Sequence, residues 1–302
     1  MTATGWMDNP YYDWSPIDRR PPLSWPGGAR LAVAVIVSLE HVNWYPPEGS
    51  HVGPSVGFYS PFPAIVDIHA ISPVEYGNRV GVFRVVELLQ RHGIPPTIAM
   101  DASTAERCPQ LVAWLQERDA EFLGHGLSLD QMVTEDMPED TERAYIARSL
   151  DAVEAATGTR PRGWLGIDYG ESTRTVELLA RAGLDYVCDW PTDEQPHPLK
   201  TSQGRIDNLP VVSECDDVVA CTARRLSPVR YGRILVEQFE RMYADSEQQG
   251  RAMVLNLHPW VIGQPYRVRH LAAALEQIGG REGVWYARGG EIIDAYRAAT
   301  QG

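Results

Sequence analysis

Short apolar segments alternate with segments of helical periodicity along most of this 302-residue chain, and no other feature constrains its fold as strongly. Residues 31–39 read Leu-Ala-Val-Ala-Val-Ile-Val-Ser-Leu, a nearly continuous apolar run that is typical of a parallel strand covered on both faces. Strands that alternate with helices join through right-handed crossovers into a parallel sheet. We therefore predict an α/β fold that forms a single, distorted (β/α) barrel with about seven parallel strands.

The predicted elements follow one another in a regular order. Strands are expected at residues 31–39, 97–100, 121–123, 186–188, 206–209, 252–257 and 284–286, with a further strand ending near Trp164. Helices are expected at residues 80–92, 105–118, 138–157, 173–182, 231–249, 266–278 and 291–298. No linker, low-complexity segment or fixed-period repeat divides the sequence, so residues 1–302 are predicted to form one domain.

Two segments lie outside this alternation. Residues 1–30 are rich in Pro, Trp and Tyr, and we interpret them as an irregular arm packed on the domain. Residues 42–78 are predicted to form a long loop, which either lines a site or mediates assembly, unless it simply wraps the surface. Because both segments are dense in aromatic side chains, we expect a homo-oligomer in which they contact a neighbouring subunit.

Composition excludes several kinds of partner. A net charge of −13 repels phosphate backbones and anionic membrane surfaces, so we expect neither nucleic acid nor a membrane as a partner. Residues Met1–Pro10 lack a basic region followed by an apolar stretch, and the four cysteines form no CxxC pair. These features indicate a cytoplasmic protein with reduced thiols that acts on a small molecule.

Polar residues stand where the predicted strands end, which is where barrel enzymes carry their chemistry. Glu40 and His41 follow the first strand, and such a pair can supply a general base and a metal ligand, or simply lie at the surface. His125 follows the strand at residues 121–123 between two glycines, which allow close approach of a ligand, although a lone histidine is often structural.

Three further strand ends carry candidate residues. Trp164 either forms a pocket wall or packs in the core, and Asp189 directly follows a strand. His258 ends the strand at residues 252–257, and Pro259 prevents that strand from continuing. The rigid turn that follows would hold the His258 imidazole fixed for proton transfer.

Taken in order, these segments resemble the motifs of the polysaccharide deacetylase superfamily (carbohydrate esterase family 4), from Leu31 to Tyr296. The pattern His-Pro-x-x-x-Gly-x-Pro-x-Arg from His258 to Arg267 is similar to the branch that contains metal-independent allantoinase and cyclic imide hydrolases. The phrase Ala-Glu-Arg-Cys-Pro at residues 105–109 resembles that branch as well. The resemblance implies a hydrolase that acts on carbon–nitrogen bonds other than peptide bonds.

The resemblance also implies roles for three residues. Glu40 matches the base that activates water, and His258 matches the acid that protonates the leaving group. His125 matches the first zinc ligand of the deacetylases. Amide hydrolysis also requires stabilisation of an oxyanion, and His125 is our candidate donor for it.

The metal site of the family is incomplete in this sequence. His41 stands where the family has a second acid, and Leu129 replaces the second histidine ligand. Asp130 is the nearest substitute, so His41, His125 and Asp130 are the candidate ligands for Zn²⁺ or another divalent ion. The allantoinase branch is similar in losing the second histidine and working without a metal, so we expect no cofactor.

The resemblance says less about the identity of the substrate, because Leu165 stands where the family usually has an arginine. Trp44, Tyr45, Tyr59 and Trp164 are expected to enclose a compact planar molecule. The candidate substrate-binding residues are Trp44, Trp164, Asp189, Trp260 and Arg267.

Three functions are therefore considered. The first is hydrolysis of a small, cyclic amide such as an imide, hydantoin or ureide. The second is deacetylation of an N-acetyl sugar or another N-acyl compound, and the third is a catalytically silent binding protein on the same scaffold. The presence of both Glu40 and His258 favours catalysis, because a silent protein would need neither.

Overall fold

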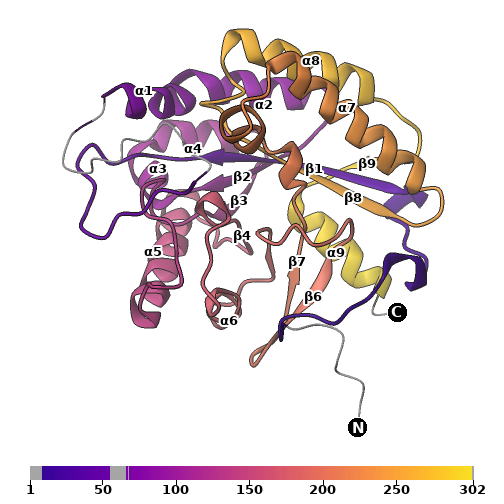
Figure 1. Cartoon of the computed structure of the whole chain (residues 1–302), viewed down its shortest axis with the longest axis horizontal. Helices are drawn as coiled ribbons and strands as arrows, with labels where there is room; N and C mark the ends of the chain where they lie inside the picture. Colours follow the sequence, from indigo (N-terminus) through magenta and orange to yellow (C-terminus); the bar gives the residue numbers. More distant parts are fainter. Residues whose placement is uncertain (1–8, 55–65, 67, 301–302) are drawn as a thin grey trace.

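The computed structural model describes residues 9–54, 66 and 68–300. Within these residues a nine-stranded sheet forms the centre of the molecule (Figure 1). Its strands are β1 (Leu31–Leu39), β2 (Pro96–Met100), β3 (Glu121–Gly124), β4 (Gly163–Trp164), β5 (Tyr186–Val187), β6 (His197–Thr201), β7 (Gly204–Asn208), β8 (Arg251–Leu257) and β9 (Val284–Tyr286). The strand order is β6-β7-β5-β4-β3-β2-β1-β8, and β9 pairs with β1.

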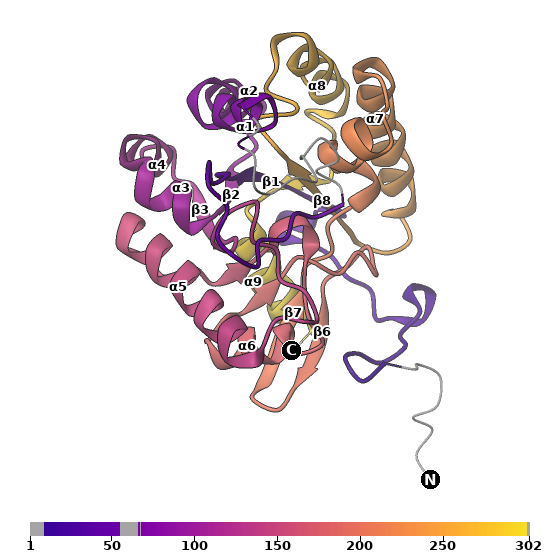
Figure 2. The same ribbon diagram turned by 60° about the vertical axis from the view of Figure 1, so that its left-hand side comes forward.

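Helices pack around this sheet. They are α1 (Ile68–Tyr76), α2 (Val82–Arg91), α3 (Ala102–Arg107), α4 (Pro109–Gln116), α5 (Glu139–Thr157), α6 (Thr175–Arg181), α7 (Pro228–Asp245), α8 (Pro265–Ile278) and α9 (Gly289–Thr300). Figure 2 shows α2 to α8 arranged in an arc around the strands. Within the described residues β6 is the one antiparallel strand, paired with β7. The curled, mostly parallel sheet confirms the predicted distorted (β/α) barrel.

The first strand shows why its sequence is apolar at nearly every position. All nine residues of β1 are buried. Val33 and Val35 belong to a core cluster shared with α2, α7 and α8 on the outside of the sheet. Ala32 and Ala34 belong to a second cluster, shared with residues of other strands and of α9. Both faces of β1 are therefore covered, as the continuous apolar run predicts.

Three elements differ from the prediction. The predicted loop at residues 42–78 is wrong in its last part, because α1 begins at Ile68 and continues through a π-helical turn, Gly77–Gly81, into α2. The predicted helix at 105–118 is two helices, because Pro109 lacks an N–H and disfavours helical geometry at Cys108 (φ −119°). The strand β6 was not predicted, because only Leu199 of its five residues is buried and no apolar run marks it.

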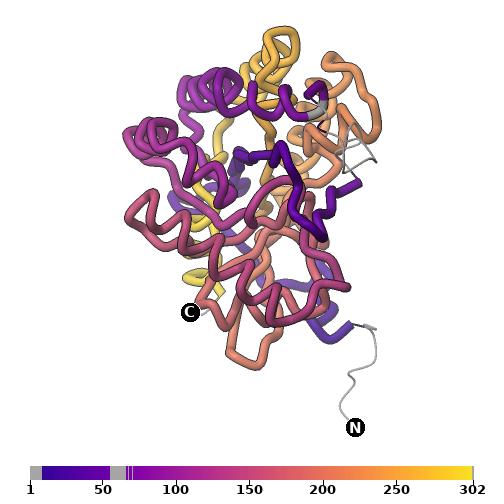
Figure 3. The backbone as a smooth tube through the Cα atoms, turned by 90° about the vertical axis from the view of Figure 1, so that its left-hand side faces the viewer, coloured from indigo at the N-terminus to yellow at the C-terminus, as the bar shows by residue number. Residues whose placement is uncertain are grey.

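The described part of the N-terminal arm packs on the domain. Trp25 is buried, and its Nε1–H donates to the carbonyl of Arg251 at the start of β8 (2.8 Å). In Figure 3 the indigo segment after β1 lies against the magenta segment after β3, where the Met132 N–H donates to the carbonyl of His51 (3.0 Å). Tyr59 lies outside the described residues. No helix within residues 9–54, 66 and 68–300 is long and apolar enough to cross a bilayer.

Candidate active site

The carboxyl ends of the parallel strands enclose a cavity of about 10 Å³, which is room for a single water molecule. Glu40 reaches it from the end of β1, His125 from the end of β3 and His258 from the end of β8. The structure thus brings together the three residues predicted to be catalytic. The rest of the lining includes Leu129, Gly166, Tyr169, Asp216, Asn256 and Trp260.

Glu40 is a buried carboxylate with a hydrogen bond to one of its two oxygens. Its Oε2 accepts the Nε1–H of Trp260 (2.8 Å), and its Oε1 lies 3.5 Å from Nε2 of His125. Burial raises the pKa of the Glu40 carboxyl, but the charge of His258 and the contacts with His125 and Trp260 outweigh it, so the pKa lies below its usual range. Glu40 is therefore ionised at neutral pH and can accept a proton from water.

His125 is almost fully buried, and one hydrogen bond fixes its tautomer. Its Nδ1 lies 2.5 Å from the carbonyl oxygen of Leu165. A carbonyl can only accept, so Nδ1 carries a proton and donates it. The other ring nitrogen, Nε2, faces Glu40 and the cavity and has no hydrogen-bond partner within the described residues. In this tautomer Nε2 can only accept a hydrogen bond, so it does not fit the predicted role of His125 as donor to the oxyanion.

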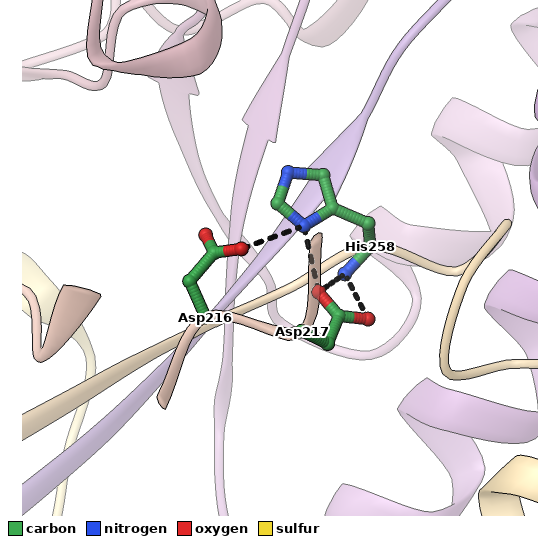
Figure 4. Close-up of side chains that lie close together, drawn as sticks. All are labelled: Asp216, Asp217 and His258. Carbon is green, nitrogen blue, oxygen red and sulfur yellow. Dashed lines mark hydrogen bonds and ion pairs between the residues drawn. The ribbon is translucent and has the colours of Figure 1, made fainter. Parts of the chain in front are cut away.

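His258 forms a buried pair with Asp217. Its Nδ1 lies 2.8 Å from Oδ1 of Asp217, whose carboxylate also accepts the backbone N–H of His258 (2.9 Å). Burial lowers the pKa of His258, but the charges of Asp216, Glu40 and Asp217 outweigh it and raise the pKa to about 10. His258 is therefore an imidazolium at neutral pH. Figure 4 shows its second ring nitrogen directed away from both aspartates, so Nε2–H is available as a proton donor.

A second aspartate stands beside this pair within a polar network. The Oδ2 of Asp216 accepts the hydroxyl of Tyr169 (2.6 Å) and the amide of Asn256 (3.0 Å). Burial and the charge of Asp216 raise the pKa of Tyr169 well above its usual value, so the hydroxyl keeps its proton. Tyr169 and the preceding Asp168 have φ of 58° and 48°, a left-handed geometry that is uncommon outside glycine and is found at functional sites.

The predicted metal ligands do not come together. Leu129 lines the cavity where the family has a histidine, and the Asp130 carboxylate accepts the side-chain amide of Asn43 (3.0 Å) instead. The His41 backbone N–H donates to Asp101 (2.6 Å), and its imidazole is not part of the cavity lining. The residues at the family's metal position therefore do not fit a metal ion.

One other group in the described part of the chain has ligand atoms within 4.8 Å of one another, formed by Asp216, Asp217 and His258 (Figure 4). The carboxylate oxygens that could bind a metal already accept hydrogen bonds. The Asp217 oxygens accept from His258 and from the Ile262 N–H, and Oδ1 of Asp216 accepts the N–H of Val218 (2.8 Å). The imidazolium of His258 is held in place by these carboxylates, so this group also does not fit a metal ion.

The predicted substrate-binding residues separate into three positions. Trp260 lines the cavity, but its indole is bound to Glu40. Trp164 is fully buried in a core cluster, with its ring 6.5 Å from that of Tyr145, so the core alternative holds and the pocket-wall prediction is corrected. Trp44 is partly exposed, and its Nε1–H donates to Glu75 (2.8 Å) rather than reaching the cavity.

The two remaining predicted residues lie outside the cavity lining. Arg267 donates to the Tyr266 hydroxyl (2.8 Å) and to the Val261 carbonyl (3.3 Å). Asp189 lies behind the lining, where its Oδ1 accepts the backbone N–H of Gly166 (2.7 Å). In this structure Asp189 therefore supports the wall of the cavity.

Sequence reasoning missed Asp216, Asp217, Tyr169 and Asn256 as site residues. Asn256 lies within β8, where all seven residues are buried, so no alternation in the sequence shows which way its side chain points. The consecutive acids Asp216 and Asp217 are a signal in the sequence, but they do not directly follow a predicted strand. Their distance from β7 hid that signal.

The strand ends of this parallel barrel gather an ionised glutamate and two histidines, one of them an imidazolium, and such groups can accept and donate protons. A family model described as polysaccharide deacetylase matches residues 74–187. This stretch of the chain therefore resembles a polysaccharide deacetylase domain.

Individual relatives agree with this assignment. A Schizosaccharomyces pombe protein named "Putative polysaccharide deacetylase" is 26% identical over 94% of each chain. A Helicobacter pylori peptidoglycan deacetylase is 21% identical over 73% of this chain and 85% of its own length. The solved structure of Puue allantoinase is similar in fold, with a TM-score of 0.83 and 23% identity over 96% of this chain and 99% of its own. The comparisons thus confirm the resemblance to polysaccharide deacetylases that the sequence motifs predicted.

Proposed function

We propose that this protein hydrolyses an amide bond in a small, cyclic substrate such as an imide, hydantoin or ureide, by acid–base chemistry of its own side chains. The observation that carries the proposal is that an ionised carboxylate, Glu40, and an imidazolium, His258, line the same enclosed cavity. A base for water and an acid for the leaving nitrogen are the two groups that this reaction requires.

The proposed reaction begins with a water molecule in the cavity beside Glu40 and His125. Glu40 takes a proton from this water as its oxygen attacks the carbonyl carbon of the substrate. As the carbon–nitrogen bond breaks, Nε2–H of His258 gives its proton to the departing nitrogen. One proton has then moved onto Glu40 and one has left His258, so proton exchange with solvent restores the starting state.

The surrounding residues support these roles. Trp260 holds one oxygen of Glu40, which leaves the other directed at His125. Asp217 holds Nδ1 of His258, so the proton available to the substrate is the one on Nε2. We infer that the reaction needs no metal, because Leu129 replaces a ligand and the donor atoms of Asp216, Asp217 and His258 are occupied.

The burial of the three catalytic candidates favours a compact substrate over a polymer. Glu40, His125 and His258 are 3%, 1% and 7% exposed, so a substrate must enter the barrel end to reach them. The net charge of −13 and the named activity of Puue allantoinase, which is similar in fold, support the same choice.

The test is a screen of the purified protein on hydantoins, allantoin, cyclic imides and N-acetyl sugars, repeated with Glu40→Gln. Gln keeps the shape and can still accept the Trp260 N–H, but it cannot take a proton, so turnover should fall about a hundredfold or more. The matched control is Glu276→Gln, on the exposed face of α8, which should retain activity. A folded Glu40→Gln variant with near-normal turnover would contradict the mechanism.

The second candidate is a deacetylase of an N-acetyl sugar or another N-acyl compound. It is favoured by the family model and by the names of the S. pombe and H. pylori relatives. The same acid–base pair would serve it, so the mechanism does not separate the two. Release of acetate from N-acetyl sugars, with no ring opening of the cyclic amides, would select the deacetylase.

A further inference from the structure

Two carboxyl groups meet inside the protein behind the cavity wall. Asp189 follows β5, and Glu171 follows the short helical turn Ile167–Tyr169. Each carboxyl lies close enough to the other to shift its pKa, and Oδ2 of Asp189 and Oε1 of Glu171 are buried with no donor among the described N–H and O–H groups. Two carboxylate oxygens can only accept, so a hydrogen bond between them requires a proton on one of the two groups.

The other oxygen of each carboxyl already accepts a hydrogen bond from a neighbouring N–H group. Oδ1 of Asp189 accepts the N–H of Gly166 (2.7 Å), and Oε2 of Glu171 accepts the Nε1–H of Trp190 (2.8 Å). Within the described part of the chain no lysine or arginine forms an ion pair with either carboxyl, and Leu165 stands where the family resemblance implies an arginine. A shared proton is thus the available means of joining the two groups.

The pair is connected to His125 through one peptide unit. Asp189 accepts the N–H of Gly166, and the carbonyl of that same peptide bond, on Leu165, accepts Nδ1–H of His125. Nε2 of His125 in turn faces Glu40. An anionic acceptor at the N–H end of a peptide makes its carbonyl a stronger acceptor, because hydrogen bonds in a chain polarise one another.

We propose that Glu171 and Asp189 share one proton and, through the Leu165–Gly166 peptide, hold the His125 ring with Nδ1 protonated and Nε2 directed at Glu40. Glu171 is the donor and Asp189 the anionic acceptor. Both are positioning residues, since neither lines the cavity. Their assigned role rests on the proposed function, but the proton between them does not.

Burial and the charge of Asp189 raise the pKa of Glu171 well above its usual range, which agrees with a protonated carboxyl. Burial also raises the pKa of Asp189, to about 7. The titratable groups that face the pair are His125, Glu142, Tyr11, Tyr169 and Cys188.

Amide variants supply a sharp test. In Glu171→Gln the amide oxygen accepts the Trp190 N–H and the NH₂ donates to Asp189, which reproduces the protonated carboxyl. In Asp189→Asn the oxygen accepts the Gly166 N–H and the NH₂ donates to Glu171. Each single variant should therefore fold with little loss. The double variant places two NH₂ groups face to face, so its unfolding equilibrium constant should rise about tenfold beyond the product of the single effects.

The pH dependence of unfolding tests the proton itself. A pKa that is raised in the folded state stabilises the protein below the ordinary glutamate pKa, and this stability is lost as pH rises toward the folded value. Urea unfolding between about pH 5 and pH 9 should show wild type losing stability relative to Glu171→Gln, by up to about tenfold in unfolding constant per pH unit. Glu276→Gln, the control, should parallel wild type.

Nitrogen NMR of the His125 ring tests the positioning role. Wild type should show the Nδ1–H tautomer, and the double variant should lose it or show exchange between tautomers. Additive stability effects, with pH curves that stay parallel, would overturn the shared proton. An unchanged His125 tautomer in the double variant would overturn the positioning role. Both results are obtained without a substrate, so they are independent of whether the proposed reaction is correct.

Discussion

Asp217 holds His258 from two sides, since its carboxylate accepts both the ring Nδ1–H at 2.8 Å and the backbone N–H at 2.9 Å. The same carboxylate accepts the N–H of Ile262 in the following turn. The general acid and the turn that carries it are therefore fixed by one side chain. Breaking this buried pair should change both proton affinity and stability.

Asp217→Asn should lower the pKa of His258, which is about 10 in the wild type. A raised histidine pKa stabilises the folded state below the ordinary value, and this stability is lost as pH rises from about 6.5 through the folded pKa. Urea unfolding at several pH values should therefore show a smaller loss of stability at alkaline pH in the variant. On a substrate found by the screen, the alkaline limb of turnover should move to lower pH. Unchanged limbs would contradict the pairing.

Trp260→Phe should remove the N–H that Glu40 accepts at 2.8 Å. Because this bond lowers the pKa of Glu40, its loss should raise that pKa and shift the acid limb of the pH–rate profile to higher pH. Trp44→Phe is the matched control, since it removes an indole N–H that binds Glu75 outside the cavity lining. Equal profiles for the two variants would show that Trp260 does not tune the base.

Chelation should leave turnover unchanged. Among the described residues, His125 has no second ligand at the family's metal position. Leu129 cannot bind a metal, and the Asp130 carboxylate is hydrogen-bonded to Asn43. Elemental analysis of the purified protein should find no stoichiometric zinc, and dialysis against a chelator should not reduce activity. Activity that disappears on chelation and returns with zinc would contradict this prediction.

Replacing Trp164 by alanine should destabilise the protein much more than replacing Trp44. Trp164 is 1% exposed in the core, whereas Trp44 is 37% exposed. Trp164→Ala should cost about 3–5 kcal/mol in the free energy of unfolding, while Trp44→Ala should stay within about 0.5 kcal/mol. Urea unfolding measures both. Similar losses would mean that the two side chains have similar surroundings.

A homo-oligomer remains our expectation for assembly. Trp14, Tyr45 and Ile68 are 62%, 83% and 61% exposed, and all three lie in or beside the arm and the segment after β1. Light scattering at micromolar concentration should give a mass above that of one chain, 33.7 kDa, and Tyr45→Ser should weaken the association. A monomeric wild type would exclude this interface.

Local pattern was sufficient to locate the three residues that reach the cavity from strand ends. The apolar runs of β1 and β8 stop at Glu40 and His258, and parallel strands bring such ends to one side of a barrel. The pattern could not predict the direction of Trp164, because β4 has only two residues and no alternation fixes its faces. It also could not find Asp217, because the segment between β7 and α7 reaches His258 only through tertiary packing.

The backbone of the π-helical turn after α1, Gly77–Gly81, packs directly against the backbone of Pro259 and Trp260. A methyl group on Gly77 would stand 2.7 Å from the backbone nitrogen of Trp260, and one on Gly81 would overlap the carbonyl of Pro259. Trp260 carries the N–H that holds Glu40. An alanine at either glycine would therefore displace the Trp260 indole and weaken its hydrogen bond to Glu40. Catalysis should fall although neither glycine contacts a substrate.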